Sequence, residues 1–182
     1  VVTAIVGPSF GGSSFISGLS DFVVQVAGPG LAVTSPNVAE VATGEAVSME
    51  ELGGTRVHSK RTGQVDQTVE TAAQAHEAIR KFLSYLPSNA WSRAPRANPS
   101  PRVHNPALSE IVPQDRRKSY DIRDLIGAIT DESSFFELGG GFASSLVTGL
   151  GHIDGHPVGI LANQPASAAG TISPDACQKA IR

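Results

Sequence analysis

Residues 1–14, VVTAIVGPSFGGSS, join a run of β-branched and apolar residues to a glycine-rich turn. Residues 1–6 have the composition of a buried strand. Gly7 and Pro8 end this run, because proline cannot donate a ladder hydrogen bond. A short helix is predicted over residues 13–19. The stretch therefore predicts a strand, a glycine turn and a helix in succession, which is typical of an α/β fold.

Cap and turn signals continue along the chain. Ser35 with Pro36 suits the start of a helix, and Ser48 with Glu51 has the spacing of a capping box. Further strands are predicted over residues 21–26, 31–34, 143–152 and 156–162, with a hairpin turn at residues 154–155. Residues 135–138 form a short apolar segment. Further helices are predicted over residues 36–42, 48–53, 65–86, 122–129 and 174–182.

A change in composition divides the chain. Six of the twelve prolines fall within residues 87–113, and proline disfavours helix interiors and central strands. We therefore expect an extended connector there, with Trp91 pinning it to a domain surface. The predicted domains are residues 1–86 and 114–182. Because both ends fall inside predicted regular elements, we expect an internal segment of a longer chain.

Composition argues against several classes of partner. The net charge of −3 over 182 residues disfavours nucleic acid, which requires a basic surface. The sequence has no polybasic run for a membrane surface, no stretch of about 20 apolar residues and no signal-peptide pattern. Cys177 is the only cysteine, so we expect a small apolar helix residue, no cysteine-based metal site and a reducing compartment, the cytoplasm.

Two nucleophile or nucleotide chemistries could use the glycine turn. A phosphate-binding P-loop is disfavoured, because Ser13 occupies the position of the lysine that meets the phosphates. A serine hydrolase is a stronger alternative, because residues 7–11 match G-x-S-x-G with Ser9 as the nucleophile. The remaining triad members would be Asp154 with His156, or Asp131 with His152.

The third chemistry is an oxyanion hole. Gly11 and Gly12 at a helix start allow backbone N–H groups to approach a ligand closely, and the helix dipole favours developing negative charge. Such a hole stabilises the enolate of a thioester. Taken alone, the motif favours a simple tight turn between a strand and a helix over an oxyanion hole.

The chain as a whole resembles the beta, or carboxyltransferase, subunit of propionyl-CoA and related acyl-CoA carboxylases. The similar segments follow one another in the order of that family. Residues 7–13 resemble its G-P-C-A-G-G-A turn, 35–38 resemble its G-P-x-V segment, and 50–58 resemble its E-E-L-G-G-A-x-x-H block. Further along, residues 82–87 resemble its F-x-x-Y-L-P and residues 158–165 its V-G-I-V-x-N-Q-P. Shorter matching segments lie between these: Leu19 to Phe22, Ile111 to Pro113, Tyr120-Asp121 and Phe135 to Glu137.

The resemblance implies a crotonase-like (ClpP/crotonase) fold of stacked β-β-α turns, with parts of two such domains in this chain. It implies transfer of a carboxyl group from carboxybiotin to the α-carbon of an acyl-CoA of the propionyl or acetyl type. Biotin would be carried by a partner domain, and a CoA thioester would be the substrate. The freed biotin nitrogen takes the α-proton in this family, so no side-chain base is required.

The resemblance also implies roles for individual residues. Gly11 and Gly12 match the glycine pair whose N–H groups stabilise the acyl-CoA enolate. Ser9, Phe10 and Ser13 flank the acyl pocket. A second pair, late in the second domain of the family, holds the biotin carbonyl. The implied partners are a biotin carboxylase and biotin carrier subunit and further copies of the chain, as a trimer of dimers.

Several residues and functions stay open. We expect His58 to be a hydrogen-bonded structural histidine, and His152 and His156 to face solvent. We expect Lys60 and Arg61 to be a solvated basic pair, with contacts to a CoA phosphate as the alternative. The roles of Asn163 and Gln164 are open. The alternative functions are a biotin-dependent acyl-CoA decarboxylase, the hydrolase using Ser9, and a non-catalytic assembly segment.

Overall fold

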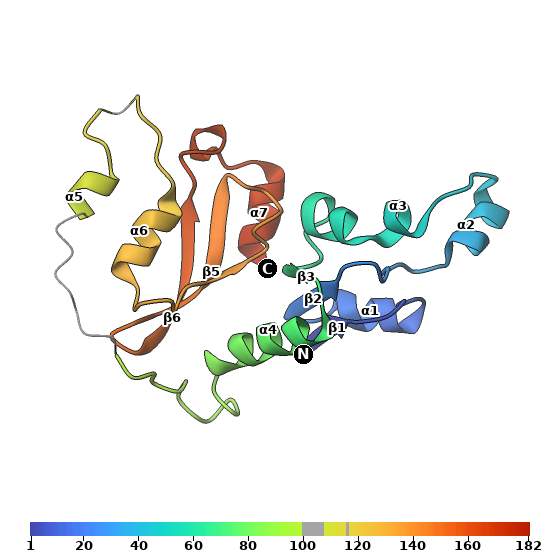
Figure 1. Cartoon of the computed structure of the whole chain (residues 1–182), viewed down its shortest axis with the longest axis horizontal. Coiled ribbons are helices and arrows are strands. Elements are labelled where there is room, and N and C mark those ends of the chain that lie inside the picture. Colours follow the sequence, from blue (N-terminus) through green and yellow to red (C-terminus); the bar gives the residue numbers. More distant parts are fainter. Residues whose placement is uncertain (100–107, 116) are drawn as a thin grey trace. The chain divides into compact units, whose positions relative to one another are not determined.

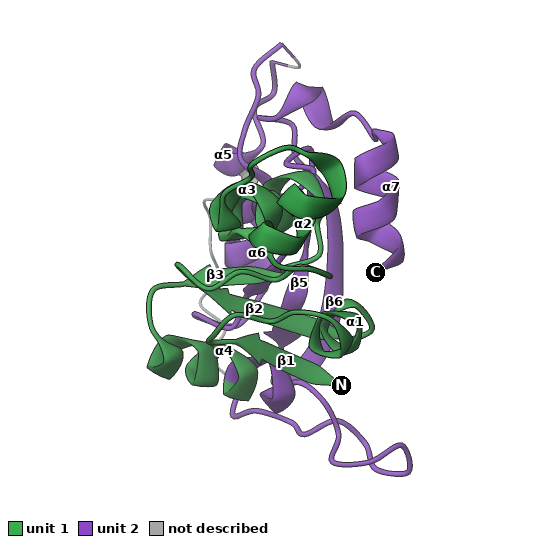
Figure 2. Cartoon of the chain, turned by 90° about the vertical axis from the view of Figure 1, so that its right-hand side faces the viewer, with its two compact units in different colours: residues 1–80 green, residues 81–182 purple. Residues whose placement is uncertain are grey.

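The structure of the chain, a computed structural model, describes residues 1–99, 108–115 and 117–182 (Figure 1). These residues form two compact units, Val1–Arg80 and Lys81–Arg182 (Figure 2). Each unit has its own three-stranded sheet. The division falls near the end of the first predicted domain, residues 1–86. Part of the predicted connector, residues 100–107, lies outside the described residues.

Unit 1 is built on a parallel sheet in the order β1 (Val2–Ile5), β2 (Phe22–Val26) and β3 (Gln67–Val69). Every residue of β2 is buried, because this strand has a neighbour on both sides. The edge strand β1 is half-buried, and Val1 and Val6 beside it are exposed. The expectation of a buried strand over residues 1–6 is therefore wrong for the two ends of this segment, Val1 and Val6.

Helices connect and cover these strands. They are α1 (Gly12–Gly18), α2 (Pro36–Thr43), α3 (Met49–Gly53), the π-helix η1 (Val57–Arg61) and α4 (Ala72–Ser84). The predicted caps are confirmed. The Ser35 hydroxyl accepts a hydrogen bond from the Val38 N–H, and Ser48 and Glu51 form a reciprocal capping box. The sequence therefore specifies where α2 and α3 begin.

Two predicted elements differ from the structure. The helix predicted over residues 65–86 begins only at Ala72, because Gln67–Val69 pairs with β2 as a strand. The Asp66 carboxylate fixes this register by accepting a hydrogen bond from the Val23 N–H at 2.7 Å. The strand predicted over residues 31–34 is reduced to a single parallel bridge between Leu31 and Ser9.

Unit 2 contains an antiparallel sheet in the order β4 (Phe136–Leu138), β5 (Leu146–Ile153) and β6 (His156–Asn163). The predicted hairpin is confirmed. Asp154 and Gly155 both have positive φ, 53° and 75°, as a two-residue turn with the twist of the strands requires. The remaining elements are α5 (Leu108–Ile111), α6 (Ile122–Ile129), the 3-10 helix η2 (Ala168–Gly170) and α7 (Pro174–Ile181).

The end of α4 belongs to unit 2. The Tyr85 ring stacks on the His152 ring at 4.7 Å between centroids, and the Tyr85 hydroxyl donates to the Ser134 carbonyl. Burial and the nearby Lys81 ammonium lower the pKa of His152. The expectation that His152 faces solvent is therefore wrong, because the side chain of Tyr85, the residue after α4, covers it. His156 is exposed, as expected.

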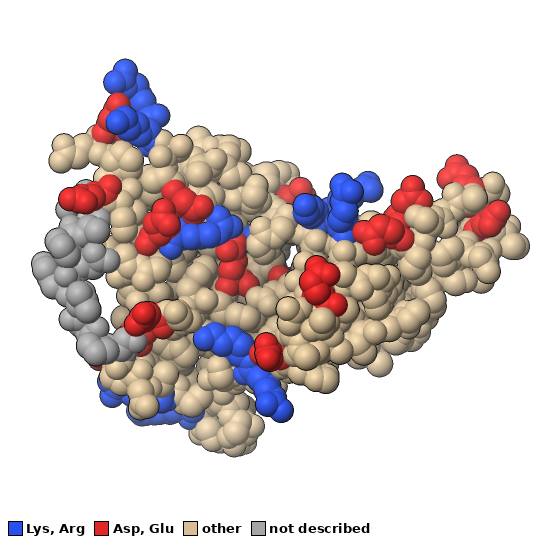
Figure 3. All heavy atoms as spheres, in the orientation of Figure 1, with Lys and Arg blue, Asp and Glu red and all other residues tan. Residues whose placement is uncertain are grey.

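The connector differs from its prediction in two respects. Trp91 is 96% exposed, so the expectation that it pins the connector to a domain surface is wrong. Residues Leu108–Ile111 form α5, so the connector is not extended throughout. Among the described residues, no helix has both the length and the apolar character needed to cross a membrane. Lys and Arg side chains are interspersed with Asp and Glu on the face drawn in Figure 3.

Lys179 on α7 is a buried cation. Its Nζ donates to the Phe142 carbonyl at 2.9 Å and to the Leu146 carbonyl at 2.7 Å. Burial lowers the pKa of Lys179 below its ordinary value of 10.5. The side chain thereby ties α7 to the turn that follows β4 and to the start of β5.

Replacing Asp121 by alanine should destabilise unit 2 by about 1 kcal/mol at pH 7, because its carboxylate caps α6. Asp121 accepts hydrogen bonds from the Arg123 N–H at 2.8 Å and from Gln164 Nε2 at 2.5 Å, which lower its pKa below 3.8. A lowered folded-state pKa gives stability above pH 3.8 that is lost as the pH falls through the folded-state value. The loss in the Asp121→Ala variant should therefore shrink in acid.

Urea unfolding at pH 7 and at several values below pH 3.8 measures this dependence. Asp121→Asn is the control, since an asparagine side chain still caps a helix but does not titrate there. A gap between wild type and Asp121→Ala that stays constant with pH would contradict the assignment.

Candidate active site

The glycine turn between β1 and α1 is fixed by backbone hydrogen bonds to residues 30–33. The Ser9 N–H donates to the Gly30 carbonyl at 2.9 Å, and the Ala32 N–H donates to the Ser9 carbonyl at 3.0 Å. The Gly11 N–H donates to the Val33 carbonyl at 3.0 Å. Gly11 has a φ of +59°, which favours glycine. Residues 9–11 therefore pair in parallel with residues 30–33, and this pairing ends at Gly11.

Gly12 differs from Gly11 in its hydrogen bonding. It is the first residue of α1 and is exposed. Among the residues that the structure describes, none accepts a hydrogen bond from the Gly12 N–H. A Cβ built on Gly12 would meet no atom within 4 Å. Of the predicted pair, Gly12 presents a free donor, whereas the donor of Gly11 is already bonded to Val33.

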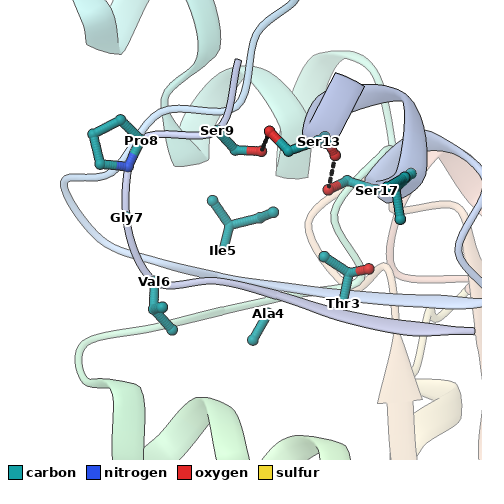
Figure 4. Close-up of a pocket in the computed structure, with 10 residues that line it drawn as sticks. Thr3, Ala4, Ile5, Val6, Gly7, Pro8, Ser9, Ser13 and Ser17 are labelled. Carbon is teal, nitrogen blue, oxygen red and sulfur yellow. Dashed lines mark hydrogen bonds between the residues drawn. The ribbon is translucent and has the colours of Figure 1, made fainter. Parts of the chain in front are cut away.

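The serines of the turn form a chain of hydroxyl contacts (Figure 4). Ser9 Oγ donates to Ser13 Oγ at 2.9 Å, Ser13 Oγ donates to the Phe10 carbonyl at 2.9 Å, and Ser17 Oγ donates to the Ser13 carbonyl at 2.9 Å. Ser9 and Ser13 line a cavity of about 300 Å³. Its other lining residues are mostly apolar and come from β1, the turn after it and α1: Thr3, Ala4, Ile5, Val6, Gly7, Pro8, Ile16 and Ser17.

The hydrogen bonds of the turn do not favour the two alternative chemistries. Ser9 donates to a second serine, and no histidine or carboxylate in the described part of the chain hydrogen-bonds to it. Both oxygens of the Asp131 carboxylate accept backbone N–H groups, from Asp154 and Gly155. Asp131 therefore orients the hairpin rather than a histidine. Ser14, the metal-binding hydroxyl of a P-loop, instead donates to the Gly11 carbonyl at 2.7 Å.

The residues whose roles were open now have positions. His58 Nε2 lies 2.6 Å from the Leu31 carbonyl, so the expectation of a hydrogen-bonded histidine is confirmed. Lys60 and Arg61 on η1 are exposed. Gln164 is buried, and its Oε1 accepts the Ile122 N–H at 3.1 Å at the start of α6. Asn163 Nδ2 donates to the Gly170 carbonyl at 2.6 Å. Asn163 and Gln164 therefore hold loops and a helix start in unit 2.

Sequence reasoning missed the residues that support the turn from behind. Gly53 allows α3 to approach residue 31, because a Cβ at Gly53 would lie 2.1 Å from the Leu31 carbonyl oxygen. Gln25, which is fully buried on β2, donates to the Pro29 and Gly53 carbonyls at 2.7 and 3.2 Å. The signal was present in the E-E-L-G-G block and in a polar residue within an apolar strand.

Comparisons with known proteins match the whole chain. The sequence model of the carboxyl transferase domain matches residues 1–182. The chain is 41% identical over 184 residues to the carboxyltransferase subunit of propionyl-CoA carboxylase from Haloferax mediterranei, covering 100% of this chain and 36% of that protein. It is 37% identical over 180 residues to the methylmalonyl-CoA carboxyltransferase 12S subunit from Propionibacterium freudenreichii subsp. shermanii, covering 98% of this chain and 34% of that protein.

A solved structure matches equally fully. Transcarboxylase 12S, a hexamer with hydrolysed methylmalonyl-coenzyme A bound, superposes with a TM-score of 0.93 at 37% identity, covering 98% of this chain and 36% of that chain. The turn, the sheets and this match together define an α/β protein of the crotonase type, which confirms the predicted fold. The chain belongs to the carboxyl transferase domain family. It spans about a third of the length of the curated relatives it matches, at 36% and 34%.

Proposed function

We propose that this chain forms the acyl-CoA side of the active site in a biotin-dependent acyl-CoA carboxyltransferase. The observation that carries the proposal is the Gly12 N–H, which is exposed and without a partner in the described residues at the end of a rigidly bonded turn. Membership of the carboxyl transferase domain family supports the assignment of this donor to carboxyl transfer.

The proposed chemistry uses the backbone of the turn. As the α-proton of the acyl-CoA leaves, negative charge builds on the thioester oxygen, and the Gly12 N–H donates to that oxygen. One such donor contributes about 3 kcal/mol to transition-state stabilisation. Gly11, whose N–H is bonded to Val33, sets the direction of the next peptide. The sequence predicts that both glycines donate to the enolate. We propose instead that Gly12 is the donor and that Gly11 shapes the turn.

The neighbouring side chains suit an acyl group. At the edge of the cavity of about 300 Å³, which is lined mostly by apolar residues, Ser9 Oγ donates to Ser13 Oγ, and Ser13 Oγ donates to the Phe10 carbonyl. We assign Ser9, Phe10 and Ser13 to the acyl surroundings and not to covalent chemistry. Biotin bound to a partner would supply the carboxyl group. No residue of this chain is assigned to hold biotin.

Partners follow from the same proposal. A relative 36% identical over 191 residues is named a biotin-dependent acetyl-/propionyl-coenzyme A carboxylase beta5 subunit, from Mycobacterium leprae, and transcarboxylase 12S is described as a hexamer. We propose a biotin carboxylase and carrier subunit as partners, a homo-oligomer arranged as a trimer of dimers, and a cytoplasmic location. The domains 1–86 and 114–182 stay part of this proposal.

The test is carboxyl transfer by the protein that carries these residues, incubated with a carboxybiotinylated carrier and with acetyl-CoA or propionyl-CoA. Label from bicarbonate should enter an acid-stable carboxyl-CoA product. Running the assay from the carboxylated CoA thioester towards biotin measures the same transfer in the direction that a decarboxylase subunit would use. Absence of label exchange in both directions would contradict the proposal.

Replacing Ser9 by alanine should leave carboxyl transfer close to that of the wild type, because Ser9 Oγ only donates to Ser13 Oγ. The measurement is the rate of label incorporation, with thioester hydrolysis followed in parallel. Ser13→Ala is the matched variant, since it removes the other partner of the same hydrogen bond. Loss of activity in Ser9→Ala together with an acyl adduct on Ser9 in the wild type would support the hydrolase instead.

A further inference from the structure

Residues 30–33 lie between the glycine turn and the α3–η1 segment and are hydrogen-bonded on both sides. On one side, the carbonyls of residues 30 and 33 accept hydrogen bonds from the Ser9 and Gly11 N–H groups, and the Ala32 N–H donates to the Ser9 carbonyl. On the other side the backbone of Leu31 turns away from the glycine turn. Its N–H donates to the Gly53 carbonyl at 2.8 Å, and its carbonyl lies 2.6 Å from His58 Nε2. The position of the turn therefore depends on what holds Leu31.

The hydrogen bond between His58 and Leu31 has a defined direction. A carbonyl oxygen can only accept, so His58 Nε2 carries the hydrogen. His58 Nδ1 then faces Thr62 Oγ1 at 3.1 Å, so both ring nitrogens have a partner. The ring is thus held in place with Nε2 directed at the Leu31 carbonyl.

The Leu31 carbonyl is enclosed where His58 reaches it. Leu31 is 3% exposed and packs in a cluster with Ile5, Val23 and Val65. The missing Cβ of Gly53 leaves room for this carbonyl and no more, since that atom would lie 2.1 Å from it. Without a side-chain donor at position 58, a nearly buried carbonyl would lose its partner.

We propose that His58 is a positioning residue of the carboxyl-transfer site, which acts through the Leu31 carbonyl and residues 30–33 to set the direction of the Gly12 N–H. The inference rests on the proposed function for its catalytic part. His58 does not touch the substrate in this role, and it neither gives nor takes a proton. Small displacements of a donor are costly, because a misplacement of about 1 Å can lower a rate about 100-fold.

The experiment compares three variants of the whole protein. His58→Leu removes the donor and keeps an apolar side chain of similar bulk. His58→Gln keeps an N–H donor near the position of Nε2. His76→Leu is the matched control, because His76 is an exposed histidine on α4 of the same unit. Amide hydrogen exchange of Gly11 and Ala32, kcat and KM for the acyl-CoA, and thermal unfolding are measured for each.

His58→Leu should speed exchange of the Gly11 and Ala32 amides and lower kcat about 10- to 100-fold, with little change in KM. His58→Gln should restore both readouts, and His76→Leu should alter neither. The inference is overturned if His58→Leu leaves the two amides protected, or if glutamine fails to rescue them while folding is intact. Because exchange is measured without turnover, this failure is distinct from a wild-type protein that shows no carboxyl transfer.

Discussion

Carboxyl transfer should fall about 100- to 1,000-fold when Gly12 is replaced by valine, because the loss of one oxyanion donor has an effect of this size. A Cβ at Gly12 would meet nothing within 4 Å, and its φ lies outside the left-handed region. The fold therefore accepts the side chain, and we expect its branched carbon to block the approach of the thioester oxygen to the N–H. The loss should appear in kcat and in acyl-CoA affinity, and the melting temperature should stay close to that of the wild type.

Gly18→Val is the matched control for this experiment. Gly18 is the last residue of the same helix, is exposed and has equal space for a Cβ. It should keep full activity. Equal losses in the two variants would show an effect on α1 itself, and full activity of Gly12→Val would remove Gly12 from the site.

Lys179→Met should destabilise unit 2 by about 2 kcal/mol. The substitution leaves the Phe142 and Leu146 carbonyls without their donor, at roughly 1–3 kcal/mol each, and relief of a buried charge offsets part of this loss. The lowered folded-state pKa means that the unfolded chain binds the proton more tightly. The contribution of Lys179 to stability should therefore rise as the pH climbs from the folded-state pKa towards 10.5.

Chemical unfolding of wild type and variant from neutral pH upwards tests both statements. Lys118→Met serves as the comparison, because Lys118 is an exposed lysine of the same unit. It should change stability little at any pH. A Lys179→Met variant as stable as Lys118→Met would show that the two carbonyls find other donors, such as water.

Local signals in the sequence predicted much of the fold. The capping box of Ser48 and Glu51, the N-cap at Ser35 and the turn at Asp154-Gly155 are confirmed, because each depends on residues within four positions of one another. The family resemblance predicted the crotonase-type fold. The location of the candidate site in the glycine turn came from the same resemblance and stays a prediction.

Long-range contacts were not predictable from local patterns. Residues 67–69 are a strand because β2 offers a free edge to them, although Gln67 and Thr68 carry little apolar signal. Residues 31–34 have strand-like composition, yet both backbone groups of Leu31 bond to α3 and η1. The Gly11 N–H is likewise bonded to the carbonyl of Val33, 22 positions further along the chain, which the sequence of the turn does not reveal.

Three successive residues of η2, Ala168, Ala169 and Gly170, have positive φ values of 46°, 51° and 71°. The turn is held by Asn163, and the two alanines adopt a conformation that L-residues disfavour by roughly 1–2 kcal/mol each. No sequence pattern signals it.

The parallel order β1-β2-β3 has a consequence for how the chain acquires its shape. Strands β5 and β6 meet across a two-residue turn and can zip together early, whereas the Asp66 contact to Val23 joins residues 43 positions apart. Until that long loop closes, one side of β2 remains an open, apolar edge. We expect unit 1 to fold more slowly than the hairpin of unit 2. While unit 1 is partly folded, the open edge of β2 can pair with another chain and lead to aggregation.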